Sequence, residues 1–290
     1  MKFSPDIQIS KLNEAQLLLH HAVQFIAASG KYLLPEQEDD SHTNMSWDPA
    51  NNIFYGGSIN SRARVGLHIP LLSLKVTGPT GIELASFSLS GKTKQEGLLW
   101  LRQALQLKQI DTSALKLKMH YKIPEHPTDS AKPFSEVDTL ILDELANHRT
   151  IADQVCNEVF TKHAKASPAR TWPHHFDHGV YVPFKFDDNG DAIQSFSVGY
   201  AVADSVINEP YFYVTQWKKE EEVDHSKAPE LEYGRWLPEK LKGAGLALSD
   251  ILKMDDHEKQ IQEFINKAVA FILAGKFALN AVLMFVNPFR

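Results

Sequence analysis

The sequence predicts an α+β fold in which largely antiparallel sheets are covered by helices. Three observations support this fold class. Stretches with apolar residues three and four positions apart, typical of helices with one buried face, open and close each half of the chain. Short alternating stretches bounded by turn residues lie between them, as expected for strands. Strands grouped between helices in this way are common in α+β proteins.

The first predicted element is a helix over residues 11–29. Ser10 is its predicted N-cap, and Gly30 is the glycine expected to end it. A polar, turn-rich stretch then runs over residues 35–52. The apolar positions of the helix mark one buried face: Leu12, Ala15, Leu19, Ala22 and Ile26.

Strands and a second helix follow in the first half. Residues 63–78 and 82–90 alternate loosely and contain β-branched residues, and a Gly-Pro-Thr-Gly turn signal lies between them. Pro70 cannot donate a backbone hydrogen bond, so it predicts an edge or a bulge in the first stretch. The second helix is predicted over residues 92–107.

The clearest predicted strand spans residues 114–124. Apolar residues from Leu115 to Tyr121 occupy alternate positions, and lysines and a histidine occupy the positions between them. This period of two predicts a strand with one buried face and one solvated, basic face.

The second half repeats this order of elements. A long helix is predicted over residues 135–164, opened by a capping box from Ser135 to Asp138. A last helix is predicted over residues 256–274. Turn residues such as Asn189-Gly190 separate the strands predicted between these helices: 179–186, 192–203, 209–217 and 243–252.

The proline-containing, polar segment 125–134 predicts a boundary in the chain. We therefore expect two α+β halves, residues 1–128 and residues 129–290, either separate or packed as one compact unit. Both halves read helix, polar histidine-bearing segment, strands and helix. Internal duplication of a helix–strands–helix unit is one explanation, and the general frequency of this order in α+β proteins is the other.

Composition restricts the class of protein. Apolar residues make up 43% and charged residues 23% of the 290 residues, which is ordinary globular usage. The formal charge is -6, and the chain has no long basic run. A non-specific nucleic-acid binder needs clustered lysine and arginine, so we expect no nucleic-acid partner.

Cysteine content and hydropathy favour a cytoplasmic protein. Cys156 is the only cysteine, so no disulfide forms within the chain, and a reducing compartment is the simpler expectation. The N-terminus has no uninterrupted apolar stretch of the kind that signal peptides carry. The longest apolar stretch, residues 268–286, is broken by Gly275, Lys276 and Asn280 and predicts a helix that enters a core. We therefore expect no membrane partner.

The densest group of chemically active side chains is the stretch Trp-Pro-His-His-Phe-Asp-His, residues 172–178. If a strand begins at Phe176, His175 and Asp177 share one face, with their Cα atoms about 6–7 Å apart. At this spacing both can bind one divalent metal ion, or the carboxylate can orient the imidazole for acid–base catalysis. We predict His175 and Asp177 as catalytic residues or metal ligands. The alternative is a structural role, with the histidines bonded to nearby carbonyl groups.

A second candidate stretch, residues 39–48, crowds hydrogen-bonding side chains beside an indole. We predict that His42, Asn44 and Trp47 contact a small polar ligand. The alternative is that this stretch forms turns and caps, for which Asp, Ser and Asn are the usual residues.

A third candidate stretch, residues 209–217, is rich in aromatic residues. As a strand it places Tyr211, Tyr213 and Trp217 on one face, where we predict that they form the wall of a binding cleft. The alternative is a core strand that is buried on both faces.

Three strings in the chain resemble those of a family of uncharacterised bacterial proteins. They are Trp-Pro-His-His-Phe-Asp, Glu-Pro-Tyr-Phe-Tyr-Val and the stretch at residues 39–48, and the resemblance covers most of the chain. It supports treating the three strings together and implies no reaction. The chain departs from the family pattern at His178, where an apolar or small residue is common, so we give His178 no site role.

Two functional hypotheses follow. In the first, the protein is cytoplasmic and has a polar, aromatic cleft for a small molecule, with or without metal-assisted or acid–base catalysis. In the second, it is a non-catalytic interaction protein whose histidines are structural and whose exposed sheet face or edge binds a partner. The first requires that the candidate stretches meet around one hollow.

Overall fold

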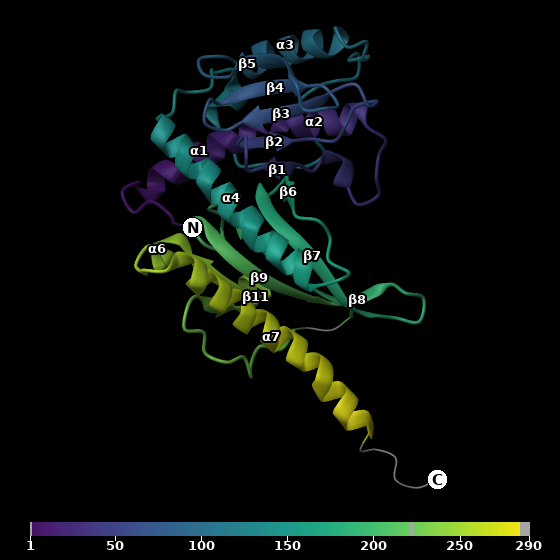
Figure 1. Cartoon of the computed structure of the whole chain (residues 1–290), viewed down its shortest axis with the longest axis vertical. Helices are drawn as coiled ribbons and strands as arrows, with labels where there is room; N and C mark the ends of the chain where they lie inside the picture. The colour runs from purple at the N-terminus through teal and green to yellow at the C-terminus, as the bar shows by residue number, and fades with distance from the viewer. Residues whose placement is uncertain (1, 221–222, 285–290) are drawn as a thin grey trace. The chain divides into compact units, whose positions relative to one another are not determined.

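The structure is a computed structural model that describes residues 2–220 and 223–284, with side chains described to residue 274 (Figure 1). It divides into two compact units. The N-terminal unit comprises residues 3–154 and 169–178, and the C-terminal unit comprises residues 1–2, 155–168 and 179–290. Antiparallel sheets and helices in both units confirm the predicted α+β class.

The N-terminal unit is built on a five-stranded sheet in the order β1-β2-β3-β4-β5, with antiparallel neighbours throughout. Helix α2 packs on β3, and α3 packs on β4 and β5. Its elements are α1 (Ile9–Ala22), α2 (Gln24–Leu33), η1 (Ser41–Thr43), β1 (Ser46–Asp48), β2 (Ile53–Tyr55), β3 (Arg64–His68), β4 (Ser73–Thr77), β5 (Glu83–Ser88), α3 (Lys94–Gln106) and η2 (Pro127–Ser130).

Apart from the strand at residues 170–172, which lies in the N-terminal unit, the remaining elements belong wholly or partly to the C-terminal unit, because the division between the units falls inside α4 and inside β7. The second sheet has the order β10-β11-β9-β8-β7-β6. The elements are α4 (Thr139–Lys162), β6 (Arg170–Trp172), β7 (Asp177–Phe186), β8 (Ala192–Ala201), β9 (Tyr211–Lys218), β10 (Arg235–Leu237), α5 (Pro238–Leu241), β11 (Gly243–Ala247), α6 (Leu248–Ile251) and α7 (His257–Met284). The break at residue 154 lies within a helix, not in the proline-containing segment where the sequence predicted a boundary.

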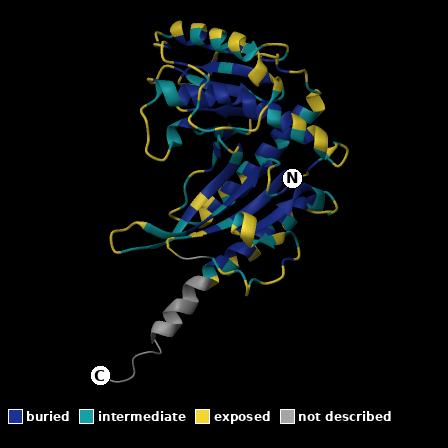
Figure 2. Ribbon diagram, turned by 180° about the vertical axis from the view of Figure 1, so that it is seen from behind, coloured by how far each residue is buried: buried dark blue, intermediate teal, exposed yellow. Residues whose placement is uncertain are grey.

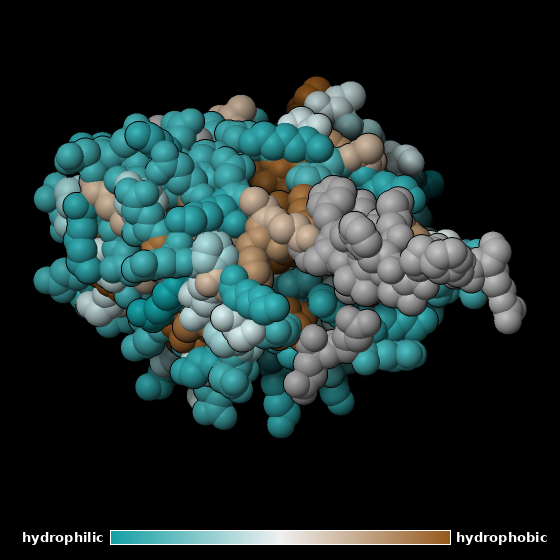
Figure 3. Space-filling model, turned by 90° about the horizontal axis from the view of Figure 1, so that it is seen from below, coloured by the Kyte–Doolittle hydropathy of each residue, from teal (hydrophilic) through white to brown (hydrophobic). Residues whose placement is uncertain are grey.

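Buried side chains concentrate on the strands of both sheets and on the helix faces that cover them, whereas the outer face of α3 is exposed (Figure 2). The face seen in Figure 3 is mostly hydrophilic, with hydrophobic side chains showing near its centre and in smaller separate places. Among the described residues, no helix combines the length and the hydropathy that a membrane span requires. The predicted apolar stretch 268–286 extends beyond the described side chains.

Several helix boundaries differ from the predictions. The predicted helix 11–29 is two helices, which meet at Val23, and Ser10 lies inside α1 without capping it. The predicted box from Ser135 to Asp138 is also wrong. Helix α4 begins at Thr139, and the Asp138 carboxylate accepts a hydrogen bond from the backbone N–H of Leu140 (2.9 Å).

Gly30 does not end a helix but lies within α2. A Cβ atom at this position would lie 2.2 Å from the carbonyl oxygen of His42 and 3.0 Å from the Cα of Thr43. The glycine is therefore required because η1 packs directly against the helix backbone. This contact fixes the 39–48 stretch on α2.

The predicted strand 114–124 is wrong, because the structure assigns no strand to this segment. Burial does alternate along it as predicted, from buried Leu115 to half-buried Tyr121. The segment is held by hydrogen bonds with side chains of other elements and not by backbone hydrogen bonds to a neighbouring strand. Tyr32 donates to the carbonyl of Lys118 (2.5 Å), and Tyr121 donates to Oε1 of Gln24 (2.9 Å).

Replacing Gly30 with alanine tests this packing. In an ordinary helix interior, alanine is about 1 kcal/mol more favourable than glycine. Here the added methyl overlaps backbone atoms that have no flexible side chain to move, and overpacking of this kind costs roughly 1–3 kcal/mol. We therefore expect Gly30→Ala to lower the denaturation midpoint measured by circular dichroism. An unchanged or higher midpoint would contradict the structure at this contact.

Candidate functional site

The stretch predicted as the start of a strand is a tight turn. Residues 173–176 form the turn, and β7 begins at Asp177. Phe176 adopts a left-handed conformation (φ 55°), and its N–H bonds the carbonyl of Trp172 (2.7 Å). Phe176 is fully buried, and His175 is exposed. The turn therefore presents His175 to solvent and directs the Phe176 ring into the core.

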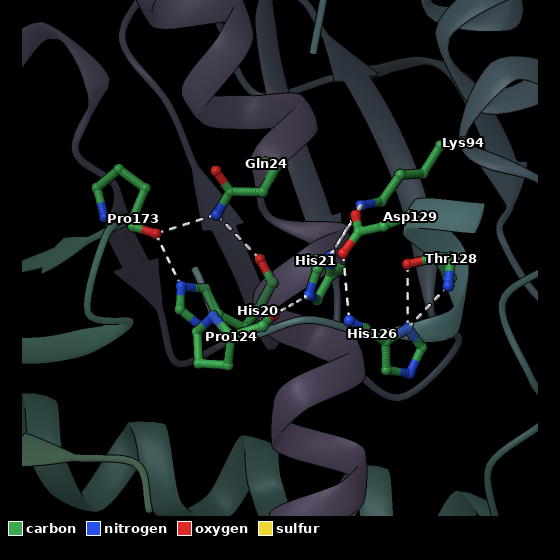
Figure 4. A network of polar contacts seen from close by, with 9 residues as sticks. All are labelled: His20, His21, Gln24, Lys94, Pro124, His126, Thr128, Asp129 and Pro173. Carbon is green, nitrogen blue, oxygen red and sulfur yellow. Dashed lines mark hydrogen bonds and ion pairs between the residues drawn. The ribbon is translucent and has the colours of Figure 1, made fainter. Parts of the chain in front are cut away.

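The turn is anchored to α1 and α2 through the carbonyl oxygen of Pro173 (Figure 4). It accepts hydrogen bonds from Nε2 of His20 (2.9 Å) and from Nε2 of Gln24 (3.0 Å). The His20 ring also stacks on the Phe176 ring, with centroids 5.3 Å apart. Because His20 and Gln24 are both buried, these bonds satisfy polar groups that would otherwise be costly.

A surface cluster forms where this turn meets the segment that follows Leu115. The rings of Tyr121 and His174 have centroids 5.8 Å apart, and those of His174 and His175 are 4.4 Å apart. The Trp172 ring lies 6.1 Å from His174. His120 lies next to Tyr121, with ring centroids 5.1 Å apart. We call His120, Tyr121, His174 and His175 the His174 surface.

Asp40 connects the 39–48 stretch to this surface. Its Oδ2 lies 3.0 Å from Nε2 of His120, and Nζ of Lys31 lies 3.3 Å from Nδ1 of the same ring. An ammonium group can only donate, so Nδ1 accepts and Nε2–H donates to the carboxylate. Asp40 itself has a left-handed backbone (φ 58°). Two of the three predicted stretches therefore meet in the N-terminal unit.

The three predicted binding residues of the 39–48 stretch have mainly local or core contacts. Nδ1 of His42 accepts from the backbone N–H of Gln37 (3.2 Å), and half-buried Asn44 follows η1 directly. Trp47 is buried, and its indole N–H donates to Oγ1 of Thr150 (3.1 Å). These contacts fit the turn-and-cap alternative for His42 and a packing role for Trp47.

The aromatic residues of β9 lie in the C-terminal unit. Tyr211 and Tyr213 belong to a buried cluster with Ile207, and Trp217 is exposed. The Tyr211 hydroxyl donates to Oδ2 of Asp204 (2.8 Å). Within this unit the two tyrosines fit the core-strand alternative. Their role as a cleft wall beside His175 stays a prediction.

His178, which received no role from the sequence, is fully buried in the N-terminal unit. Its Nδ1 lies 2.8 Å from Oγ1 of Thr171, and its Nε2 lies 3.3 Å from Oδ1 of Asp153. Nearby, the buried guanidinium of Arg149 lies over the Phe176 ring (4.1 Å) and donates to the Phe176 carbonyl (3.0 Å). These buried side chains therefore support the turn from the interior of the N-terminal unit.

Sequence reasoning also missed the cluster around His21 (Figure 4). Nε2 of His21 donates to the carbonyl of Pro124 (2.8 Å), and Nδ1 accepts from Nζ of Lys94 (2.8 Å). Lys94 also donates to Oδ1 of Asp129 (2.5 Å). The ring of His126 packs beside that of His21, with centroids 5.1 Å apart. The available signal was a histidine pair inside the apolar run Leu-Leu-Leu-His-His-Ala-Val, because buried imidazoles require partners.

Burial disfavours the charged form of the buried and half-buried imidazoles. Desolvation lowers the pKa of His20 to about 4. Desolvation also lowers the pKa of His21, His126 and His174, and the neighbouring His175 lowers the pKa of His174 further. A neutral imidazole both donates and accepts hydrogen bonds, so the His174 ring suits recognition of polar groups.

The described side chains include no group of three or more His, Cys, Asp or Glu residues arranged to hold a metal ion. His175 and Asp177 therefore supply at most two of the three protein ligands that catalytic zinc usually takes. Asp177 acts electrostatically on His174 and offsets part of the lowering of its pKa by burial.

Comparison of the chain with protein-family models, with curated proteins and with solved structures finds no match. The resemblance to a bacterial family therefore stays an interpretation of the three strings.

The lowered pKa of His20 predicts acid sensitivity. Its folded-state pKa, about 4, lies below the unfolded value of 6.5, so the unfolded chain binds more protons between these values. The free energy of unfolding therefore falls as the pH drops through this window, by roughly 2–3 kcal/mol between pH 7 and 4.5. We expect His20→Gln, which keeps an N–H donor but does not titrate, to show a shallower pH dependence in urea denaturation.

The matched control for this experiment is Leu107→Gln, at an exposed position without a titrating group (82% exposed). This control should keep the pH dependence of the parent chain. If His20→Gln also kept it, His20 would not be a buried, neutral residue in the folded protein.

Proposed function

We propose that the protein is a cytoplasmic small-molecule-binding protein whose ligand contacts the His174 surface. One observation carries the proposal: three segments far apart in the sequence bring Asp40, His120 and His174 together in one unit. A purely structural cluster would be expected to be buried and fully bonded, as His21 is. Instead, His120 and His175 are exposed, and His174 is half-buried.

The chemistry of this surface favours a planar ligand with an anionic group. Tyr121 and Trp172 both lie beside His174, and aromatic rings stack on planar rings. Lys118 and Lys122 are exposed at alternate positions from His120, so they provide positive charge along the same segment. An aromatic carboxylate combines both features.

The same surface supports an acid–base version of the proposal. In it, the exposed His175 imidazole transfers a proton, and the Asp177 carboxylate assists electrostatically. Asp177 acts on the neighbouring His174, and a carboxylate near an imidazole stabilises the protonated ring. Binding is the central proposal, and catalysis is an extension of it.

The interaction-protein alternative has one observation in its favour. Strand β5 is an edge of the N-terminal sheet, and it exposes Leu84 (40%), while Ile82 just before it is 68% exposed. An apolar edge strand can pair with a strand from another chain. The Leu84→Lys variant would then reduce self-association or partner binding without affecting the His174 surface.

A titration with benzoate tests the binding proposal. We expect saturable shifts of the histidine ring signals in two-dimensional NMR spectra, and weaker shifts with benzylamine, which carries the opposite charge. His174→Ala removes a hydrogen-bonding ring that neighbours two aromatic side chains. The expected loss of about 1–2 kcal/mol corresponds to roughly tenfold weaker binding.

His163→Ala is the matched control, because His163 is half-buried and lies in the C-terminal unit. It should bind benzoate within about twofold of the parent chain, since it removes no contact of the proposed site. Equal binding by His174→Ala and the parent, or shifts that never saturate, would overturn the proposal.

A further inference from the structure

A second surface of the N-terminal unit shares no residue with the His174 surface. Two adjoining hollows of about 690 and about 630 Å³ lie between the start of α1 and the segment that leads into α4. They share four lining residues, Gln8, Lys11, Asp138 and Ile141. We call them together the α1–α4 groove.

The groove is elongated along α1. Its lining extends from Gln8, at the helix start, to Leu18, in the third turn. Ten residues of helix span roughly 15 Å, which is too long for a single small cation and matches about three turns of another helix.

The wall of the groove is apolar. Leu140 is 68% exposed although it lies in the first turn of α4, and Ile7, Val137 and Ile141 beside it are only half-buried. Exposure of a full leucine side chain forgoes a stabilisation of roughly 2 kcal/mol that burial would provide. A partner that covers Leu140 would recover part of it.

The rim of the groove is acidic. It carries five exposed carboxylates: Asp6, Glu14, Glu136, Asp138 and Asp143. Among the residues that line the groove, Lys11 is the one lysine or arginine, and Glu14 pairs with it at 3.0 Å. His126 at one end adds no charge at neutral pH, because burial lowers its pKa. This charge repels nucleic acids and anionic membranes and attracts basic partners.

We propose that the α1–α4 groove docks an amphipathic basic helix of a partner protein. Apolar residues at positions i, i+3/i+4 and i+7 of that helix contact Leu140 and Ile141, and flanking lysines or arginines face the acidic rim. Recognition of an amphipathic helix by an apolar groove is a common binding mode. The acidic rim sets the sign of the charge that the partner carries.

The test uses the full chain and a fluorescein-labelled model peptide of leucine and lysine, with the leucines at helical spacing. We expect saturable binding by fluorescence anisotropy at physiological salt. A peptide with the same composition but scattered leucines, and one with glutamate in place of lysine, should each bind at least tenfold more weakly. No binding of the model peptide, or equal binding of the scattered peptide, would overturn the proposal.

Two variants with matched controls separate docking from general charge attraction. Leu140→Gln and Glu136→Lys each change one exposed groove residue, so both should leave the fold intact. Loss of one buried leucine contact or one charge reversal should weaken binding roughly tenfold. Leu107→Gln, at 82% exposure, and Asp188→Lys make the same changes outside the groove. If these controls weakened binding equally, the groove would not be the docking site.

Discussion

The buried histidine pair of α1 is the constraint on which the N-terminal unit depends. His20 and His21 are 3% and 0% exposed, so each ring must find hydrogen-bond partners inside the protein. Nε2 of His20 forms a hydrogen bond with the carbonyl of Pro173, and Nε2 of His21 forms one with the carbonyl of Pro124. Two loops remote in sequence are thereby fixed to one helix.

This constraint explains how the candidate site is assembled. The bond from His20 holds the turn that carries His174 and His175. Gln24 donates to the same Pro173 carbonyl and accepts from Tyr121, so it joins the turn to the segment after Leu115. Buried donors that hold loops in this way position exposed side chains without contacting a ligand themselves. The histidines of the unit therefore fall into two sets, one that supports the architecture and one that faces solvent.

Two surfaces of opposite character result on the N-terminal unit. The His174 surface combines imidazoles with an aromatic ring and has Asp40, Lys118 and Lys122 beside it, whereas the α1–α4 groove combines carboxylates with exposed aliphatic side chains. Because the two surfaces share no residue, the proposed small anion and the proposed basic helix would bind without competing directly. Both surfaces depend on α1, which anchors the turn of the His174 surface through His20 in its last turn and lines the groove through Lys11 near its start.

The sequence by itself determined the fold class, most of the longer strands and the approximate positions of the helices, because residue periodicity reports which side of an element is buried. It also identified His174 and His175 as part of an unusual stretch. It failed at residues 114–124, since alternation reports burial and not the presence of a neighbouring strand. It failed at Gly30, whose role depends on the His42 carbonyl. Only the tertiary structure decided which histidines are buried and bonded and which are exposed, because their partners come from segments up to 153 residues away.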